Sequence, residues 1–200
     1  MIKNHYNGGL TREKFLFFEI RIVSALIIQG KSRDEICDEI FSENLFQFPT
    51  EKMIKSITRT CFKRIDALNV PKLVYDLANA SLDIAKQINL YAIMCENRIV
   101  YDFMTEVIGE KYRSQEFDFS SKDLNIFFIE LSEKVPAVNT WSESTLKNLK
   151  RVLVRFLVEC DYLESAKSQN LLPVYLYPEL EEAIRQKGDL DALAAFNCFC

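Results

Sequence analysis

Residues 50–68 read TEKMIKSITRTCFKRIDAL, and this stretch decides the fold class. Its apolar residues recur every three or four positions, which is typical of a helix with one buried face. Thr50 stands directly before them and is a preferred helix-capping residue. The predicted buried side is formed by Met53, Ile54, Ile57, Cys61, Ile65 and Leu68.

The opposite side of this predicted helix is basic. At 100° per residue, four cations fall within about 80° of arc, with a serine beside them. These residues are Lys52, Lys55, Arg59, Lys63 and Ser56. Residues 45–72 contain six cations against two carboxylates, although the whole chain carries a net charge of −4. The alternative interpretation is an ordinary solvated helix face.

A second helix is predicted just before the basic one. Ser32 and Glu35 have the spacing of a capping box, and Ile36, Ile40 and Phe41 share one side of the helix that would follow. Helix, short turn and basic helix follow in the order of a helix-turn-helix element, whose second helix enters the major groove of DNA. The sequence therefore predicts a DNA-binding helix pair.

The same periodicity extends along most of the chain. The 200 residues hold only five Gly and five Pro, fewer than turn-rich β folds need. We therefore expect a mainly α fold. The first helix is expected from about Thr11 to Gln29 and should be central, because it is apolar nearly all round. Further helices are expected over about 121–134, 142–160, 178–187 and 189–196.

The C-terminal part has the order of a winged helix. A long helix over 142–160 is followed by a polar turn at 165–170 and a predicted short strand at 171–177. Trp141 is expected to be a buried anchor under this wing. The polar break at 114–120 predicts two domains: a helical bundle over residues 1–115, and a winged-helix-like lobe over residues 120–200.

The long C-terminal helix offers a second candidate DNA-binding face. Its basic residues recur every four positions, and one more cation lies at the predicted tip of the wing. The candidates are Lys147, Lys150, Arg151, Arg155 and Lys167. A solvated face explains this pattern equally well, because nearby carboxylates offset much of the charge.

Composition limits the remaining functions. Residues 1–11 are polar and do not read as a signal peptide, so a cytoplasmic location is expected. The most apolar stretch, residues 15–28, contains Glu19 and Arg21, which argues against a membrane span. Because the pI is near 5.2, any DNA-binding surface must be local.

Catalysis is not expected. His5 is the sole histidine, so no histidine-based triad or zinc site can be built. The six cysteines are scattered except for Cys198 and Cys200, and no C-x-x-C, phosphate-binding loop or nucleophile elbow occurs. We therefore predict no enzyme activity, no cofactor, no metal and no small-molecule substrate.

Several stretches carry a resemblance to a known family. They are EIRIVSAL at 19–26, NLFQ at 44–47, WSEST at 141–145, YLE at 162–164 and LPV at 172–174. With the basic helices between them, they resemble the BrxA family, a small component of bacterial BREX phage-defence systems. The resemblance implies a cytoplasmic helical protein with helix-turn-helix and winged-helix-like elements, whose partners are double-stranded DNA and other BREX components. The rival hypothesis is a protein–protein adaptor within the BREX assembly without direct DNA contact.

Overall fold

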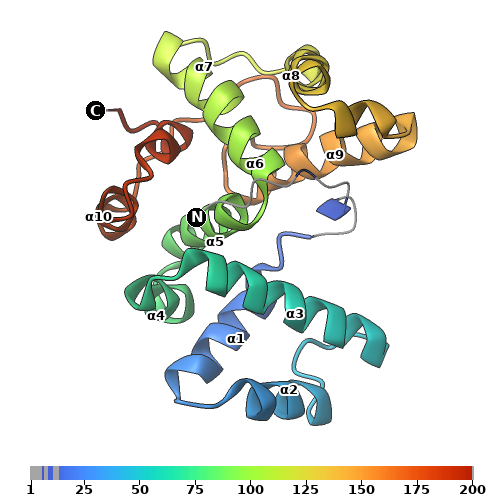
Figure 1. Ribbon diagram of the computed structural model, residues 1–200. Helices are drawn as coiled ribbons and strands as arrows, with labels where there is room; N and C mark the ends of the chain where they lie inside the picture. The colour runs from blue at the N-terminus through green and yellow to red at the C-terminus, as the bar shows by residue number, and fades with distance from the viewer. Residues whose placement is uncertain (1–5, 7–8, 11–13, 200) are drawn as a thin grey trace. The chain divides into compact units, whose positions relative to one another are not determined.

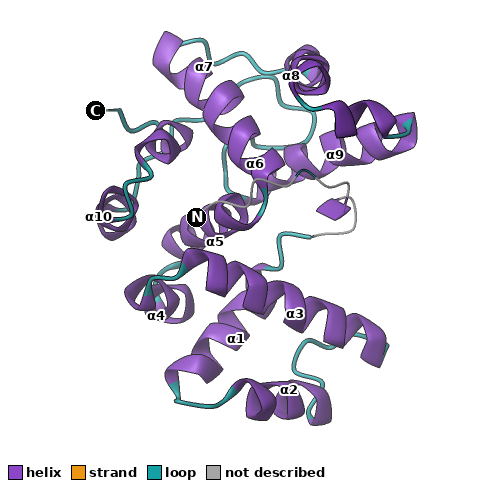
Figure 2. Cartoon of the chain, viewed as in Figure 1, coloured by secondary structure: helices purple, strands orange, loops and turns teal. Residues whose placement is uncertain are grey.

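The computed structural model describes residues 6, 9–10 and 14–199 and is mainly helical, as predicted. None of the described residues lies in a β-strand (Figure 2). The chain divides into two compact units. One comprises residues 16–96, and the other comprises residues 97–199 with the described residues before position 16. This division lies earlier in the chain than the polar stretch at 114–120 that suggested a domain boundary.

The first unit is a bundle of five helices within residues 16–96 (Figure 1). They are α1 (Phe17–Ile28), α2 (Arg33–Ser42), α3 (Glu51–Leu68), α4 (Pro71–Asn79) and α5 (Leu82–Glu96). Helix α5 packs against α3 and α4, and α1 packs against the same two helices. Residues 88–95 of α5 are all buried, so α5 contributes a continuous buried segment to the interior.

Helix α1 begins later in the chain than predicted. It begins at Phe17, because Leu16 adopts a left-handed backbone conformation with φ of 56° that a helix cannot continue. The predicted cap, Thr11, lies outside the described residues. The side chain of Phe18 is 72% exposed, but ten of the twelve residues of α1 are buried or half-buried. Helix α1 packs against α2, α3, α4 and α5, as expected for a central helix of this unit.

Helices α2 and α3 begin where the sequence placed them. Ser32 and Glu35 form the predicted capping box, and the Thr50 hydroxyl accepts a hydrogen bond from the Met53 amide at 3.3 Å. Residues 43–50 connect the two helices, and Asn44 closes this loop through two 3.1 Å hydrogen bonds to the Phe48 backbone. The connection is longer than the turn of about three to four residues in a helix-turn-helix. The expectation of a short turn is therefore wrong.

The second unit contains the remaining helices. A continuous helical run comprises α6 (Arg98–Asp102), the π-helical turn η2 (Phe103–Ile108) and α7 (Gly109–Ser114). It is followed by α8 (Ser121–Lys134), η3 (Pro136–Thr140), α9 (Glu143–Glu159), α10 (Pro178–Gln186) and η4 (Leu190–Phe196). Both η2 and α7 pack against η4. This packing places the run in the second unit.

The predicted strand at 171–177 is wrong. This segment is extended, but its backbone groups pair with two different regions instead of one neighbouring strand. The Leu171 amide donates to the Phe117 carbonyl at 2.7 Å, whereas the Leu172 amide donates to the Tyr162 carbonyl at 2.9 Å. An isolated antiparallel bridge joins Asp118 and Asn170, just before this segment. A β-hairpin wing is therefore absent from residues 161–177.

Trp141 is half-buried rather than fully buried. Its side chain lines a hollow of about 400 Å³, together with Phe128, Val138 and Leu146. Since no wing covers this hollow, the expected anchor under a wing is also incorrect.

We predict that Trp141→Ala lowers the free energy of unfolding by about 1 to 2 kcal/mol. Complete burial would give about 3 to 5 kcal/mol, and a half-buried ring loses less contact when it is truncated. Chemical denaturation followed by circular dichroism measures the change. A loss above about 3 kcal/mol would show that the ring is fully enclosed.

Candidate functional site

The basic residues predicted on the third helix all lie on the exposed side of α3. Lys52, Lys55, Ser56, Arg59 and Lys63 are exposed. They face solvent because the opposite side of α3 buries Ile54, Cys61, Ile65 and Leu68 in the core of the first unit. We call Lys52, Lys55, Arg59 and Lys63 the α3 stripe.

Other cations of this region do not add to the stripe. Arg64 is fully buried, so its charge is absent from the surface. The Lys72 ammonium forms an ion pair with Asp76 at 2.6 Å. The local positive excess seen in the sequence is therefore concentrated in the four residues of the stripe.

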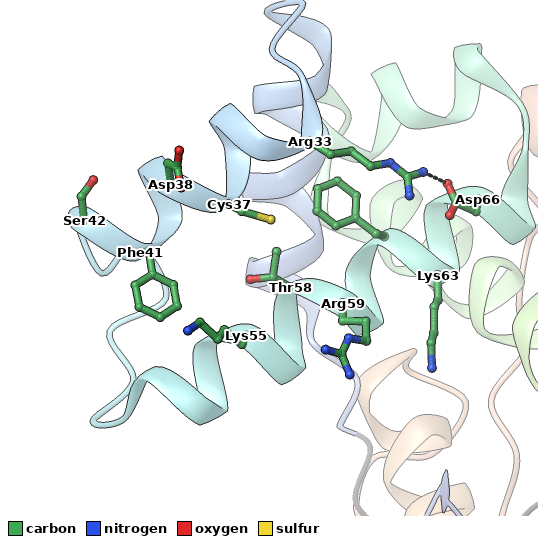
Figure 3. Close-up of a pocket in the computed structure, with 11 residues that line it drawn as sticks. Arg33, Cys37, Asp38, Phe41, Ser42, Lys55, Thr58, Arg59, Lys63 and Asp66 are labelled. Atoms are coloured by element: carbon green, nitrogen blue, oxygen red, sulfur yellow. Dashed lines mark hydrogen bonds and ion pairs between the residues drawn. The ribbon is translucent and has the colours of Figure 1, made fainter.

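An open groove of about 800 Å³ lies between α2 and α3 (Figure 3). Lys55, Arg59 and Lys63 line it from α3, whereas Lys52 and Ser56 do not. The α2 side is lined by Arg33, Cys37, Asp38, Phe41 and Ser42. The sequence did not reveal this groove, because helical periodicity places residues on a face but does not show how far apart two helices stand.

The groove has an apolar floor. The rings of Phe41 and Phe62 both line the groove; Phe41 is half-buried, and Phe62 is 8% exposed. Burial raises the pKa of the Cys37 thiol, and the nearby carboxylates of Asp34 and Asp38 act in the same direction. The thiol is therefore neutral near pH 7 and belongs to the apolar surface.

The rim of the groove keeps an excess of positive charge. Arg33 lies over the Phe62 ring at 5.0 Å and pairs with Asp66. The Lys55 ammonium lies 4.7 Å from the centre of the Phe41 ring. The charges of Arg33 and Asp66 offset each other. The remaining charged residues of the lining are three cations, Lys55, Arg59 and Lys63, and one carboxylate, Asp38. Such a surface attracts anions.

The second predicted face, on α9, is only partly available. Lys147, Arg151 and Arg155 are exposed. Lys150 is half-buried: its ammonium donates to the Asn125 side-chain oxygen at 2.6 Å and lies 5.6 Å from the Phe128 ring centre. Lys150 therefore connects α9 to α8.

Lys167 lies in an exposed turn. The turn is closed by a 3.0 Å hydrogen bond from the Ser165 amide to the Ser168 hydroxyl. Lys167 was a candidate because it was expected at the tip of a wing. No hairpin forms here, so this reason no longer applies. The structure shows Lys167 as an exposed cation and gives it no specific role.

Comparison with known proteins identifies the family. The sequence model of the BrxA family matches residues 4–188. The chain belongs to the BrxA family. A "BREX protein BrxA" from Bacillus cereus (strain H3081.97) is 31% identical over 191 residues, which cover 94% of this chain and 95% of that protein. Another protein of the same name, from Escherichia coli O9:H4 (strain HS), is 24% identical and covers 97% of this chain and 92% of its own length.

The BrxA fold is also present in a solved structure. The crystal structure of an uncharacterized protein from Magnetospirillum magneticum matches with a TM-score of 0.79 and 22% identity. The match covers 96% of this chain and 97% of that one. At this identity the likeness concerns the fold alone.

Two further findings concern metal and membrane. Within residues 6, 9–10 and 14–199, no three His, Cys, Asp or Glu side chains are grouped so that they could hold a metal ion. His5 and Cys200 lie outside the described residues. No helix in the described part of the chain is both long and apolar enough to span a membrane.

Proposed function

We propose that this BrxA-family protein is a non-enzymatic component of a BREX phage-defence system that binds double-stranded DNA with little sequence preference. The observation that carries the proposal is the α3 stripe, in which four exposed cations lie on one side of a helix whose other side is buried. Its buried side holds the helix in the core, so the cations are presented on a fixed scaffold.

The geometry of the stripe suits a row of phosphates. Lys52 and Lys63 are separated by about 16 Å along the helix axis at 1.5 Å per residue. Lysine and arginine contacts to phosphates position a protein on DNA without reading the bases. The exposed Ser56 hydroxyl adds one neutral donor beside the stripe. Binding should therefore be sequence-tolerant.

The rival function is that of an adaptor that binds another BREX component. Cationic faces attract acidic protein surfaces as well as phosphates. One feature favours this rival specifically: the apolar floor of the α2–α3 groove, which phosphate contacts do not need.

A gel-shift titration of the purified protein tests the proposed function. The protein alone should shift several duplexes of unrelated sequence, with affinities that agree within about threefold. The absence of any shift at low salt would contradict direct DNA binding and favour the adaptor.

Substitution of the basic residues on α9 and in the turn after it should weaken duplex binding less than substitution of the α3 stripe. The double variant Lys147→Glu with Arg151→Glu should weaken duplex binding by about tenfold, because two candidate phosphate contacts become repulsive. Lys167→Glu should weaken it by only about twofold to threefold, since it changes one contact in an exposed turn. Fluorescence anisotropy with a labelled duplex measures both. Unchanged affinity in the double variant would remove α9 from the DNA-binding surface.

A further inference from the structure

We propose that the α2–α3 groove binds an acidic amphipathic helical segment of a partner protein. The proposal rests on the form and charge of the groove and does not require that the protein bind DNA. Where the proposed function also holds, the two ligands compete, because Lys55, Arg59 and Lys63 belong both to the groove and to the α3 stripe.

The floor of the groove indicates a ligand with apolar side chains. The groove has a volume of about 800 Å³ and is open to solvent. The rings of Phe41 and Phe62 and the neutral thiol of Cys37 form this floor. A DNA duplex presents phosphates and base edges, and its thymine methyl groups lie inside the major groove, where they cannot fill such a hollow.

The rim indicates the pattern of acidic residues in the ligand. Lys55, Arg59 and Lys63 recur every four residues of α3, which places them about 6 Å apart along the axis. Carboxylates at positions i, i+4 and i+8 of a second helix have the same spacing. A helix lying along α3 can therefore place one carboxylate beside each cation while its apolar side enters the groove. Helices bind grooves between helices in this manner in several recognition systems.

The other wall sets the orientation of the ligand. Asp38 lies on the α2 side and would repel a second acidic edge, and Arg33 is engaged by Asp66. The acidic edge of the ligand should therefore face α3, and the edge that faces α2 should be neutral or basic. This asymmetry distinguishes an amphipathic segment with one acidic edge from a uniformly acidic tail.

The probe is a fluorescein-labelled helical peptide of about 16 residues, with leucines along one side and glutamates at every fourth position along one flank. We expect saturable binding in the micromolar range by fluorescence anisotropy. A peptide with glutamine in place of each glutamate should bind at least about tenfold more weakly, and so should a peptide with alanine in place of each leucine. Absence of binding, or equal binding of all three peptides, would overturn the proposal.

Variants of the protein show where the peptide binds and distinguish peptide binding from duplex binding. Cys37→Trp fills the groove and should weaken peptide binding at least about tenfold while duplex binding changes less than about twofold. Phe41→Ala removes part of the floor and provides a second groove variant in case the larger side chain disturbs folding. Phe18→Ala removes an exposed ring of α1 outside the groove and is the matched control, which should bind both probes normally.

Charge variants complete the test. Arg59→Glu with Lys63→Glu should weaken both ligands, whereas Lys52→Glu should weaken duplex binding alone, because Lys52 does not line the groove. Peptide binding that is insensitive to Cys37→Trp and Phe41→Ala would overturn the groove as the site. If the peptide behaves as expected and no duplex binds, the groove proposal stands and the DNA-binding proposal fails.

Discussion

Reversing the charges of Lys52, Lys55, Arg59 and Lys63 together is expected to weaken duplex DNA binding by about 100-fold or more at low salt. The change removes four candidate phosphate contacts and adds four repulsive charges. The thermal midpoint should change little, because all four side chains are exposed and exposed charges contribute little to folding stability. Anisotropy titrations of the same labelled duplex and thermal melts measure the two quantities.

The matched control reverses four exposed cations elsewhere and produces the same net charge. Suitable residues are Arg113, Lys122, Lys134 and Lys187, which lie in the second unit and are exposed. This control should keep most of the affinity, since it leaves the α3 stripe intact. If the control binds as weakly as the α3 variant, the effect is one of overall charge and the stripe is an ordinary solvated face.

The second large effect is expected at Gly109, at the start of α7. A Cβ atom added there would lie 2.8 Å from the Cβ of Ala194 and 3.1 Å from its carbonyl carbon. Neither atom belongs to a flexible side chain, so the backbone must move. We expect Gly109→Ala to lower the free energy of unfolding by about 1 to 3 kcal/mol. Helix propensity alone would raise the free energy of unfolding by about 1 kcal/mol. The sign of the change therefore shows whether the clash with Ala194 or the helix propensity of alanine dominates.

A double-mutant cycle isolates this contact. Gly109→Ala combined with Ala194→Gly removes the closest contact, between the two Cβ atoms, and should recover part of the lost stability. Urea unfolding of the four proteins measures the coupling. A stabilising effect of Gly109→Ala alone would show that α7 and η4 separate readily, contrary to the close packing described here.

The helix starts could be predicted from the sequence because short-range chemistry determines them. Ser32 and Thr50 cap α2 and α3 as expected. Helix α9 begins directly after its cap, Ser142, and α10 begins at Pro178, both close to the predicted starts. In each case a side chain satisfies free amide groups, or a proline removes one, and no distant residue is needed. The exposed side of α3 followed from the same local periodicity.

The errors arise where distant residues determine the result. Residues 171–177 have strand-forming side chains, but the amides of Leu171 and Leu172 donate to the carbonyls of two different regions, at Phe117 and Tyr162, and no strand forms. The π-helical turn at Phe103–Ile108 has no local signal that we recognised. The groove depends on the separation of α2 and α3, which the loop over 43–50 and the packing of both helices set together. Tertiary packing therefore overrides local propensity at these sites.

The salt dependence of duplex binding tests the central proposal most directly. If the α3 stripe binds DNA through about four phosphates, the logarithm of the association constant should fall linearly with the logarithm of salt concentration, with a slope of about −3 to −4. The charge-reversal variant should lose this dependence together with its affinity. A slope near zero for the unmodified protein would contradict phosphate binding by the stripe.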